Sequence, residues 1–282
     1  MLLGVMGSLT AFVIYAFALY LGYASFGIVP FAVGISLISV WGSYYSSDKI
    51  VLSMTGAKLI DHDSAPQLFN LVHEITIASG LPMPKVAVVI DDAPNAFATG
   101  RNPEHALIAF TTGILDVMDR DQLQGVIAHE LAHVANRDTL VSAVAATTAG
   151  AIAIVSDVLA RMMFFGGRRD NNNNANPIAL VFSLIILILA PLAAVMLKSA
   201  ISRKRESLAD ATAVSFTRNP AGLRSALEVL AADSTVVQQR STAVAHIWIE
   251  SPLDAKSVSK MFSTHPPIQE RIAVLKSMES LG

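Results

Sequence analysis

The sequence predicts a mainly α-helical membrane protein with about four transmembrane helices and a small β-sheet. Of its 282 residues, 53% are apolar and only 15% are charged, whereas about 25% of the residues of a soluble protein are charged. No charged residue occurs in residues 1–45 or in residues 171–197. Each gap exceeds the roughly 20 residues that a helix needs to cross a bilayer. A wholly soluble protein is therefore disfavoured.

Composition also limits the partners and the chemistry. The net charge of −2 does not give the basic footprint of nucleic-acid-binding proteins, so we expect no nucleic-acid partner. The chain contains no cysteine, which excludes disulfides, a thiolate nucleophile and zinc bound by cysteine. Any metal ion must therefore bind His, Asp or Glu side chains.

An N-terminal transmembrane hairpin is expected over residues 1–46. Its two spans cover about residues 3–23 and 26–46, with a break near Pro30. A cleaved signal peptide is the alternative, because the Ala-Phe-Ala of residues 16–18 resembles a cleavage site. We favour the retained hairpin, because no Lys or Arg precedes the first apolar run and a second run follows directly.

A second, inserted transmembrane hairpin is expected over residues 140–197. Apolar spans at about 140–159 and 177–197 flank a polar loop that contains four consecutive asparagines. The earlier span is rich in Ala, Gly and Thr, which suits close helix packing in a bilayer but also fits a buried helix of a soluble domain. The later span is strongly apolar despite Pro191.

Four spans would place residues 47–139 and 198–282 on the same side of the membrane, where they form one aqueous domain in two parts. Basic residues decide the orientation only weakly. Lys198 and the basic run 203–205 follow the fourth span and favour the cytoplasm, whereas the arginines of the loop before that span favour the opposite side.

The aqueous domain is expected to combine helices with a few strands. Apolar spacing predicts a helix over residues 65–78, and Gly80 is a suitable C-terminal stop. Residues 85–90 and 106–111 have strand patterns on either side of a turn-rich piece, residues 91–100, and suggest a small antiparallel pair. Further helices are expected over residues 121–136, 198–216, 220–233 and 267–278.

The strongest chemical signal is the run His-Glu-Leu-Ala-His at residues 129–133. Positions i and i+4 of a helix lie on the same face, so His129 and His133 can bind one ion while Glu130 faces a water molecule at that ion. This pattern is the H-E-x-x-H zinc motif of metallopeptidases. The alternative is a pair of surface histidines on an amphipathic helix, which the strongly helix-forming flanks disfavour.

A catalytic zinc ion usually has three protein ligands, so a third must come from elsewhere. The other histidines are isolated in the sequence: His62, His73, His105, His246 and His265. Glu206 and Asp210 share a helix face and could supply a ligand and a carboxylate that orients a histidine. The alternative is a solvated, charged helix start. His133 and Glu206 would each lie about 10–12 Å from a span boundary at 1.5 Å per residue, which favours a site close to the bilayer.

Three ordered motifs together resemble the HtpX family of heat-shock-associated membrane zinc metalloproteases, which is distantly similar to the CAAX prenyl endopeptidases. The first is the segment 129–138, His-Glu-Leu-Ala-His-Val-Ala-Asn-Arg-Asp. The second is Arg-Glu-x-x-Ala-Asp at residues 205–210, and the third is Thr-His-Pro-Pro-x-x-x-Arg at residues 264–271. The Pro-Asn-Ala-Phe-Ala run at residues 94–98 and both predicted hairpins extend the resemblance over essentially the whole chain.

The resemblance implies a gluzincin-type catalytic domain with one Zn²⁺ ion per chain, with residues 47–139 and 198–282 as its two parts. It implies His129, His133 and Glu206 as zinc ligands, Glu130 as the catalytic base, and Asp210 as a carboxylate that orients a ligand. It further implies an integral protein of the prokaryotic plasma (inner) membrane with its catalytic domain in the cytoplasm. The expected substrates are polypeptides, above all damaged or misassembled membrane proteins, as in stress response and protein quality control.

Two further expectations come from the same resemblance. The substrate is expected to pair with the strand that follows the Asn-Ala-x-Ala piece, which places residues 96–99 and that strand at the cleft, with Asn95, Ala96, Phe97 and Ala98 as substrate-binding residues. His265 is expected to donate a hydrogen bond to the oxyanion in the transition state; the alternative is that it caps the final helix beside Pro266 and Pro267.

Two other functions remain as alternatives. A membrane metal-binding or transport protein would carry polar groups inside its spans, but the predicted spans contain almost none apart from Asp157. A catalytically inactive scaffold of the same fold is disfavoured by the intact Glu130.

Overall fold

The computed structural model describes residues 7–8, 11, 14–15, 27–140, 203–233, 248–249 and 267–280. Most of the predicted first span, the inserted hairpin with its asparagine-rich loop, His246 and His265 lie outside these residues. The contacts divide the chain into two units, residues 1–46 with 144–199 and residues 47–143 with 200–282. The four-part division with its membrane assignments stays a prediction.

The first long helix of the described residues is α2, Ile28–Thr55. Its part Ile28–Ser46 is the one helix among the described residues that is long and apolar enough to cross a membrane. Large apolar side chains project from this part, with Phe31 73% and Ile38 74% exposed. The helix continues beyond the predicted end at Ser46, because Val51 packs into the core of the second unit with only 1% exposure.

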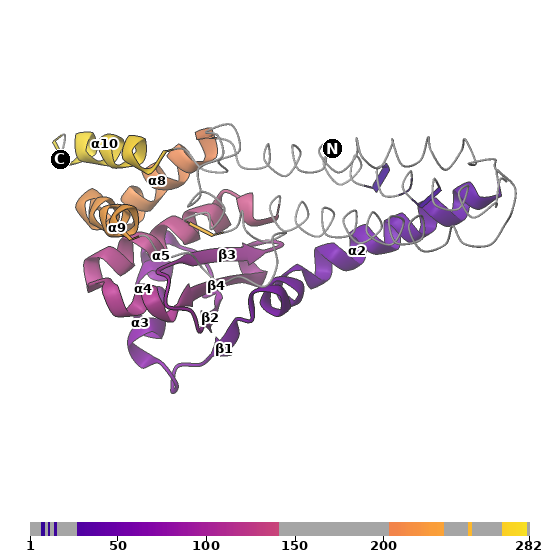
Figure 1. Cartoon of the computed structure of the whole chain (residues 1–282), viewed down its shortest axis with the longest axis horizontal. Coiled ribbons are helices and arrows are strands. Elements are labelled where there is room, and N and C mark those ends of the chain that lie inside the picture. The colour runs from indigo at the N-terminus through magenta and orange to yellow at the C-terminus, as the bar shows by residue number, and fades with distance from the viewer. Residues whose placement is uncertain are drawn as a thin grey trace, which may run out of the picture. The chain divides into compact units, whose positions relative to one another are not determined.

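Among the described residues, the second unit contains a mixed sheet of four strands (Figure 1). The strands are β1 Lys58–Ile60, β2 Lys85–Val89, β3 Ala96–Gly100 and β4 Ala106–Thr111, and their order is β1-β2-β4-β3. β1 pairs antiparallel with β2, and β3 pairs antiparallel with β4. β3 is therefore an edge strand.

The predicted antiparallel pairing of β2 with β4 is wrong, because these two strands are parallel neighbours, with Val86 opposite Ile108. The turn-rich piece between them contains β3, which the strand patterns did not predict. The chain thus reverses twice, and β4 enters the sheet between β2 and β3 in the direction of β2.

The helices of the aqueous domain lie close to their predicted positions. They are α3 Pro66–Ser79, α4 Thr112–Val117, α5 Arg120–Ala135, α8 Arg203–Thr217, α9 Pro220–Ala232 and α10 Ile268–Glu279, with a 3₁₀ turn at Pro103–His105. The predicted stop of α3 is confirmed: Gly80 adopts a left-handed conformation (φ 71°), and Leu81 N donates to Thr76 O, as in common helix C-caps. The sequence did not predict α4 or β1, which are only six and three residues long.

Two cores lie on opposite faces of the sheet. Successive side chains of a strand point to opposite faces, so Ala98 and Ile108 pack with α3 and α5, whereas Phe97 and Leu107 pack with Val51 and Trp248. Trp248 meets the Phe97 ring edge-on, with centroids 4.8 Å apart.

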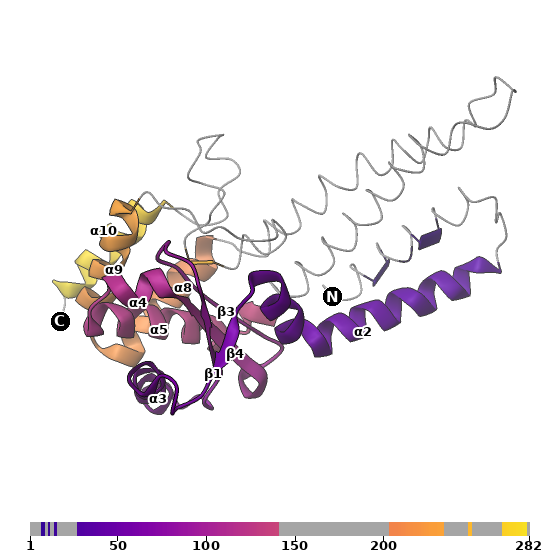
Figure 2. The same ribbon diagram turned by 60° about the horizontal axis from the view of Figure 1, so that its bottom comes forward.

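α5 is the central helix of the domain, in contact with β3 and β4 and with α3, α8 and α9. α9 can approach closely because a Cβ at Gly125 of α5 would lie 2.6 Å from Leu223 Cα. α10 in turn packs beside α9, away from β1 (Figure 2). The two histidines of the sequence motif therefore lie on the central helix, where His129 is buried and His133 is partly buried.

Candidate metal centre

Helix α5 is fixed at its start by a reciprocal cap. The Asp119 side chain accepts a hydrogen bond from Gln122 N, and the Gln122 side chain accepts one from Asp119 N, an arrangement that satisfies two otherwise unpaired donors. The helix then brings His129 and His133 to one face, with ring centroids 4.7 Å apart. His129 is 1% and Glu130 3% exposed.

Glu206 of α8 completes a cluster of three candidate ligands with the two histidines. Its carboxylate oxygens lie 3.6 Å from His129 Nε2 and 3.6 Å from His133 Nε2, and the two Nε2 atoms are 3.1 Å apart. A tetrahedral ion bonded at about 2.1 Å keeps its ligand atoms about 3.4 Å apart. The donor set and its spacing therefore fit a metal ion such as zinc.

The first histidine is oriented by a buried ion pair between α8 and α10. His129 Nδ1 donates to Asp210 Oδ1 at 3.0 Å, which leaves Nε2 for a metal ion. Arg271 Nε and Nη2 donate to the two Asp210 oxygens at 2.9 and 2.7 Å. Arg271 Nη1 also lies 3.5 Å from Glu206 Oε2. Arg271 thus holds both carboxylates of α8.

The second histidine is oriented by a different carboxylate. His133 Nδ1 donates to Asp138 Oδ2 at 3.1 Å, and Arg205 Nη1 lies 3.2 Å from Asp138 Oδ1. Asp138 can reach back to α5 because Arg137 takes a left-handed conformation (φ 60°) that ends the helix. Each histidine therefore contacts a carboxylate that is itself paired with an arginine.

These surroundings give the two histidines opposite electrostatic behaviour in the metal-free protein. Burial and the nearby Arg271 guanidinium lower the pKa of His129 to about 4. Burial alone would also lower the pKa of His133, but the carboxylates of Glu206 and Asp138 outweigh it and raise the value to about 9. Burial likewise opposes ionisation of Asp210, yet Arg271 and His129 hold its pKa far below the usual range. A metal ion must therefore displace a proton from His133.

The three other histidines of the described residues do not join this cluster. His62, His73 and His105 are exposed. His62 contacts Asp63 and the Phe69 ring, and His105 contacts Asn102. His246 and His265 lie outside the described residues.

The predicted substrate-binding residues Ala96, Phe97 and Ala98 lie in β3, an edge strand of the described sheet, and Asn95 directly precedes it. The strand that follows, β4, lies between β2 and β3. Thr111 N donates to Asn95 O at 2.9 Å, so the backbone groups of the alternating residues Ala96 and Ala98 face away from β4. Ile249 N donates to Ala96 O on that outer side at 2.9 Å. The Phe97 side chain packs in the core on the face away from α5 and so points away from the metal cluster.

Sequence reasoning assigned no role to Asp138, Arg205 or Arg271, although all three lie within the quoted motifs. The one local signal was for Asp138, an acidic residue just beyond the end of α5 and therefore close to His133. Arg271 lies 61 residues from its partner Asp210, and no spacing rule predicts such a pair.

Comparison with known proteins agrees with this geometry. Residues 63–279 match the model of the family described as peptidase family M48. The chain is 44% identical over 250 residues to a "Protease HtpX homolog" of Syntrophobacter fumaroxidans, covering 86% of this chain and 87% of that protein. It is also 44% identical over 268 residues to the homolog of Caldanaerobacter subterraneus subsp. tengcongensis, covering 94% and 89%.

A solved structure shares the fold at low sequence identity. The crystal structure of S. mikatae Ste24p aligns with a TM-score of 0.54 and 18% identity over 96% of this chain. This chain spans only 65% of the length of that protein, and the likeness supports the fold alone.

The matched family model, the two homologs and the cluster of His129, His133 and Glu206 agree with one another. The chain therefore belongs to peptidase family M48, as an HtpX-type metallopeptidase.

Proposed function

We propose that this protein is a zinc-dependent endopeptidase of the prokaryotic plasma membrane that cleaves damaged or misassembled membrane proteins. The observation that carries the proposal is the approach of Glu206 to within 3.6 Å of both motif histidines. One Zn²⁺ ion per chain would bind His129, His133 and Glu206. When bound, zinc supplies a Lewis acid that polarises the scissile carbonyl and acidifies a water molecule.

The residues around this site have separate roles in the proposed reaction. Glu130 takes the proton of the attacking water and passes it to the leaving amine. Glu130 is buried, and its charge contributes to the raised pKa of His133, which is consistent with a position beside the ligands. Asp210 holds His129 in the tautomer that leaves Nε2 free to bind zinc.

Extended substrate would add to the outer edge of β3, by the backbone pairing that sheet edges offer to peptides. The Ala96 carbonyl already accepts a hydrogen bond from Ile249 N. The backbone of Ala98 would therefore provide the hydrogen bonds next to the metal site, with Asn95, Ala96 and Phe97 fixing the strand.

His265 would donate a hydrogen bond to the oxyanion, a contact whose loss usually lowers kcat by about 10²–10³-fold. His265→Ala distinguishes this role from a helix cap. A catalytic His265 predicts slow cleavage at an unchanged melting temperature, and a cap predicts early melting with normal kcat per folded molecule.

Membrane attachment would use α2 together with the predicted hairpins. Trp41, 68% exposed, and Tyr45, 49% exposed, lie at the end of the apolar part of α2 and are in ring contact. Aromatic residues are enriched at the membrane–water interface, so these two would mark the level at which α2 leaves the bilayer. The polar residues Asp48 and Lys49 follow directly, and a cytoplasmic catalytic domain would begin there.

The test uses the full chain purified in detergent, incubated with casein with and without zinc. We expect wild-type protein to cleave casein only with zinc, and Glu130→Gln to bind zinc but lose nearly all cleavage. A fully active Glu130→Gln variant would refute the mechanism. A wild-type protein that binds zinc but cleaves neither casein nor a misfolded membrane protein would support the scaffold alternative.

A further inference from the structure

The two chain ends that border residues 141–202 both carry parts of the metal centre. His133 and Asp138 lie just before this segment, and Arg205 and Glu206 lie just after it. Asp138 Oδ1 and Arg205 Nη1 are 3.2 Å apart, so one ion pair joins the two ends. A residue of each end, His133 and Glu206, is a candidate metal ligand.

This ion pair differs from the one that orients His129. Arg271 and Asp210 are both buried and join α10 to α8, without the chain ends that border residues 141–202. Arg205 has a side chain that is 35% exposed, and that of Asp138 is 13% exposed. Asp138 is thus buried and Arg205 half-buried, so this pair is less enclosed than the Arg271–Asp210 pair.

The geometry of the Asp138–Arg205 pair bears on the position of the Glu206 carboxylate. Arg205 directly precedes Glu206 on α8, so fixing the Arg205 guanidinium restricts where the Glu206 carboxylate can lie. One Asp138 oxygen accepts the hydrogen bond from His133 Nδ1, and the other faces Arg205. The pair therefore links the segment that carries His133 to the segment that carries Glu206, whose carboxylate Arg271 Nη1 also approaches at 3.5 Å.

We propose that Asp138 and Arg205 form a clasp that holds Glu206 at ligand distance from His133. Zinc affinity then depends on the relative position of the two chain ends that border residues 141–202. Both are positioning residues. The inference rests on the proposed zinc site. Any displacement of the two ends away from each other would open the clasp and weaken zinc binding.

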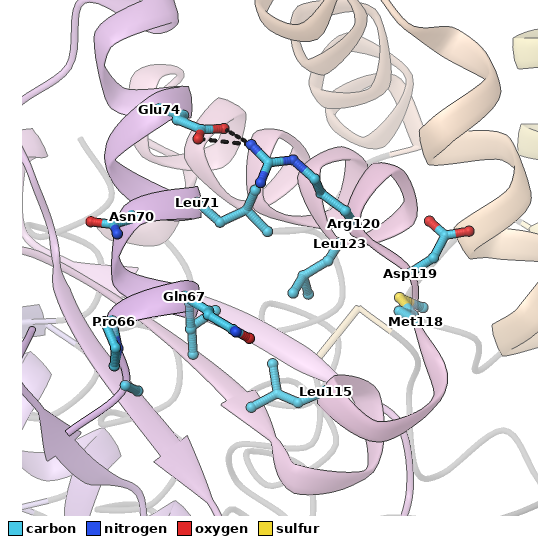
Figure 3. Close-up of a pocket in the computed structure, with 12 residues that line it drawn as sticks. Pro66, Gln67, Asn70, Leu71, Glu74, Leu115, Met118, Asp119, Arg120 and Leu123 are labelled. Carbon is cyan, nitrogen blue, oxygen red and sulfur yellow. Dashed lines mark hydrogen bonds and ion pairs between the residues drawn. The ribbon is translucent and has the colours of Figure 1, made fainter.

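The chain offers a matched control in the Arg120–Glu74 pair. Arg120 Nη2 contacts both Glu74 oxygens at 2.7 and 2.6 Å beside a pocket between α3 and the start of α5 (Figure 3). Arg120 lies nine residues before His129 on α5, about 14 Å along the helix. It is a more exposed arginine–carboxylate pair, with side chains 65% and 46% exposed, and it does not reach the metal centre.

The first experiment measures zinc affinity by competition with a chelator, on the full chain in detergent. Removal of a group that orients a metal ligand usually weakens binding by about 10–100-fold. We expect a loss of that size for Arg205→Met, partial recovery for Arg205→Lys, and no loss for Arg120→Met. Asp138→Asn keeps an acceptor for His133 but loses the charge that attracts Arg205, so it should weaken zinc binding, and adding Arg205→Met should weaken it little further.

The second experiment needs no metal and uses the absence of native cysteine. Spin labels on Asp121→Cys of α5 and Leu208→Cys of α8, both exposed positions, report the separation of the two helices in the metal-free protein. We expect a single narrow distance distribution in the wild-type background and a broader one with Arg205→Met, but not with Arg120→Met.

The outcomes separate the clasp from the proposed function. Zinc binding by Arg205→Met at wild-type affinity, or an equal loss in Arg120→Met, would overturn the clasp while leaving the zinc site intact. An unchanged distance distribution in Arg205→Met would also overturn it. Failure of the wild-type protein to bind zinc would overturn the proposed function, and the clasp with it.

Discussion

Substitution of Arg271 by Met should destabilise the catalytic domain far more than a surface substitution does. Arg271 is 5% exposed and donates two hydrogen bonds to Asp210, which is itself 3% exposed. Met has a similar length but no charge. In the variant, the buried Asp210 carboxylate therefore loses Arg271 and keeps its contact with His129. Breaking a buried ion pair by removing one partner usually costs about 3–5 kcal/mol.

That free energy corresponds to a large shift in melting temperature. For a domain of 150–250 residues, 1 kcal/mol lowers Tm by about 2–4 °C, so we expect a fall of about 6–20 °C. The chain has two tryptophans, and in a Trp41→Phe background the buried Trp248 reports unfolding of the catalytic domain alone. The measurement is made with a chelator present, because bound metal would itself raise Tm.

Two further variants identify the cause. Arg271→Lys keeps the charge but not the two-pronged hydrogen bonding, so it should fall between wild type and Arg271→Met. Asp210→Asn combined with Arg271→Met removes the orphaned charge and should lose less than the sum of the two single variants, by about 0.5–3 kcal/mol. If Arg271→Met melts within 1 °C of wild type, or if the two substitutions are additive, the Arg271–Asp210 ion pair does not stabilise the domain as expected.

Three other predictions follow from the same geometry. Glu206→Ala should lose zinc more severely than Asp210→Ala, because Glu206 faces both Nε2 atoms whereas Asp210 contacts Nδ1 of His129; the reverse order in a zinc titration would contradict the assignment. The raised pKa of His133, about 9, means that the metal-free fold has its full stabilisation from protonated His133 below pH 6.5 and loses it as the pH rises through 9. Over the same range zinc must displace that proton, so affinity should rise about tenfold per pH unit, with about one proton released per ion in calorimetry; a flat profile would disprove the raised pKa. Gly125→Ala places a Cβ 2.6 Å from the Leu223 backbone and should destabilise the domain by about 1–3 kcal/mol, whereas Gly34→Ala, with nothing within 4 Å, should not; equal melting temperatures would show that α9 shifts freely.

The sequence by itself determined the features that depend on neighbours along the chain. Helix α5 and its His-Glu-x-x-His face follow from the helix-forming residues around the motif and from the i, i+4 spacing of the two histidines. The end of α3 follows from the freedom of Gly80 to adopt a positive φ. The apolar character of residues 28–46 needs only composition. These signals predicted the mainly helical class and two of the three candidate ligands.

Only the tertiary structure decided the features that join distant segments. The directions of β2 and β4 depend on β3, whose alanine-rich sequence has no strong strand pattern. The sequence placed Glu206 and Asp210 on one helix face and favoured Glu206 as the ligand only by its longer side chain and by a resemblance. The structure shows that Glu206 faces the Nε2 atoms. Asp138 and Arg271 complete the site through ion pairs across 67 and 61 residues. Such pairs depend on how helices pack, and no local propensity encodes that.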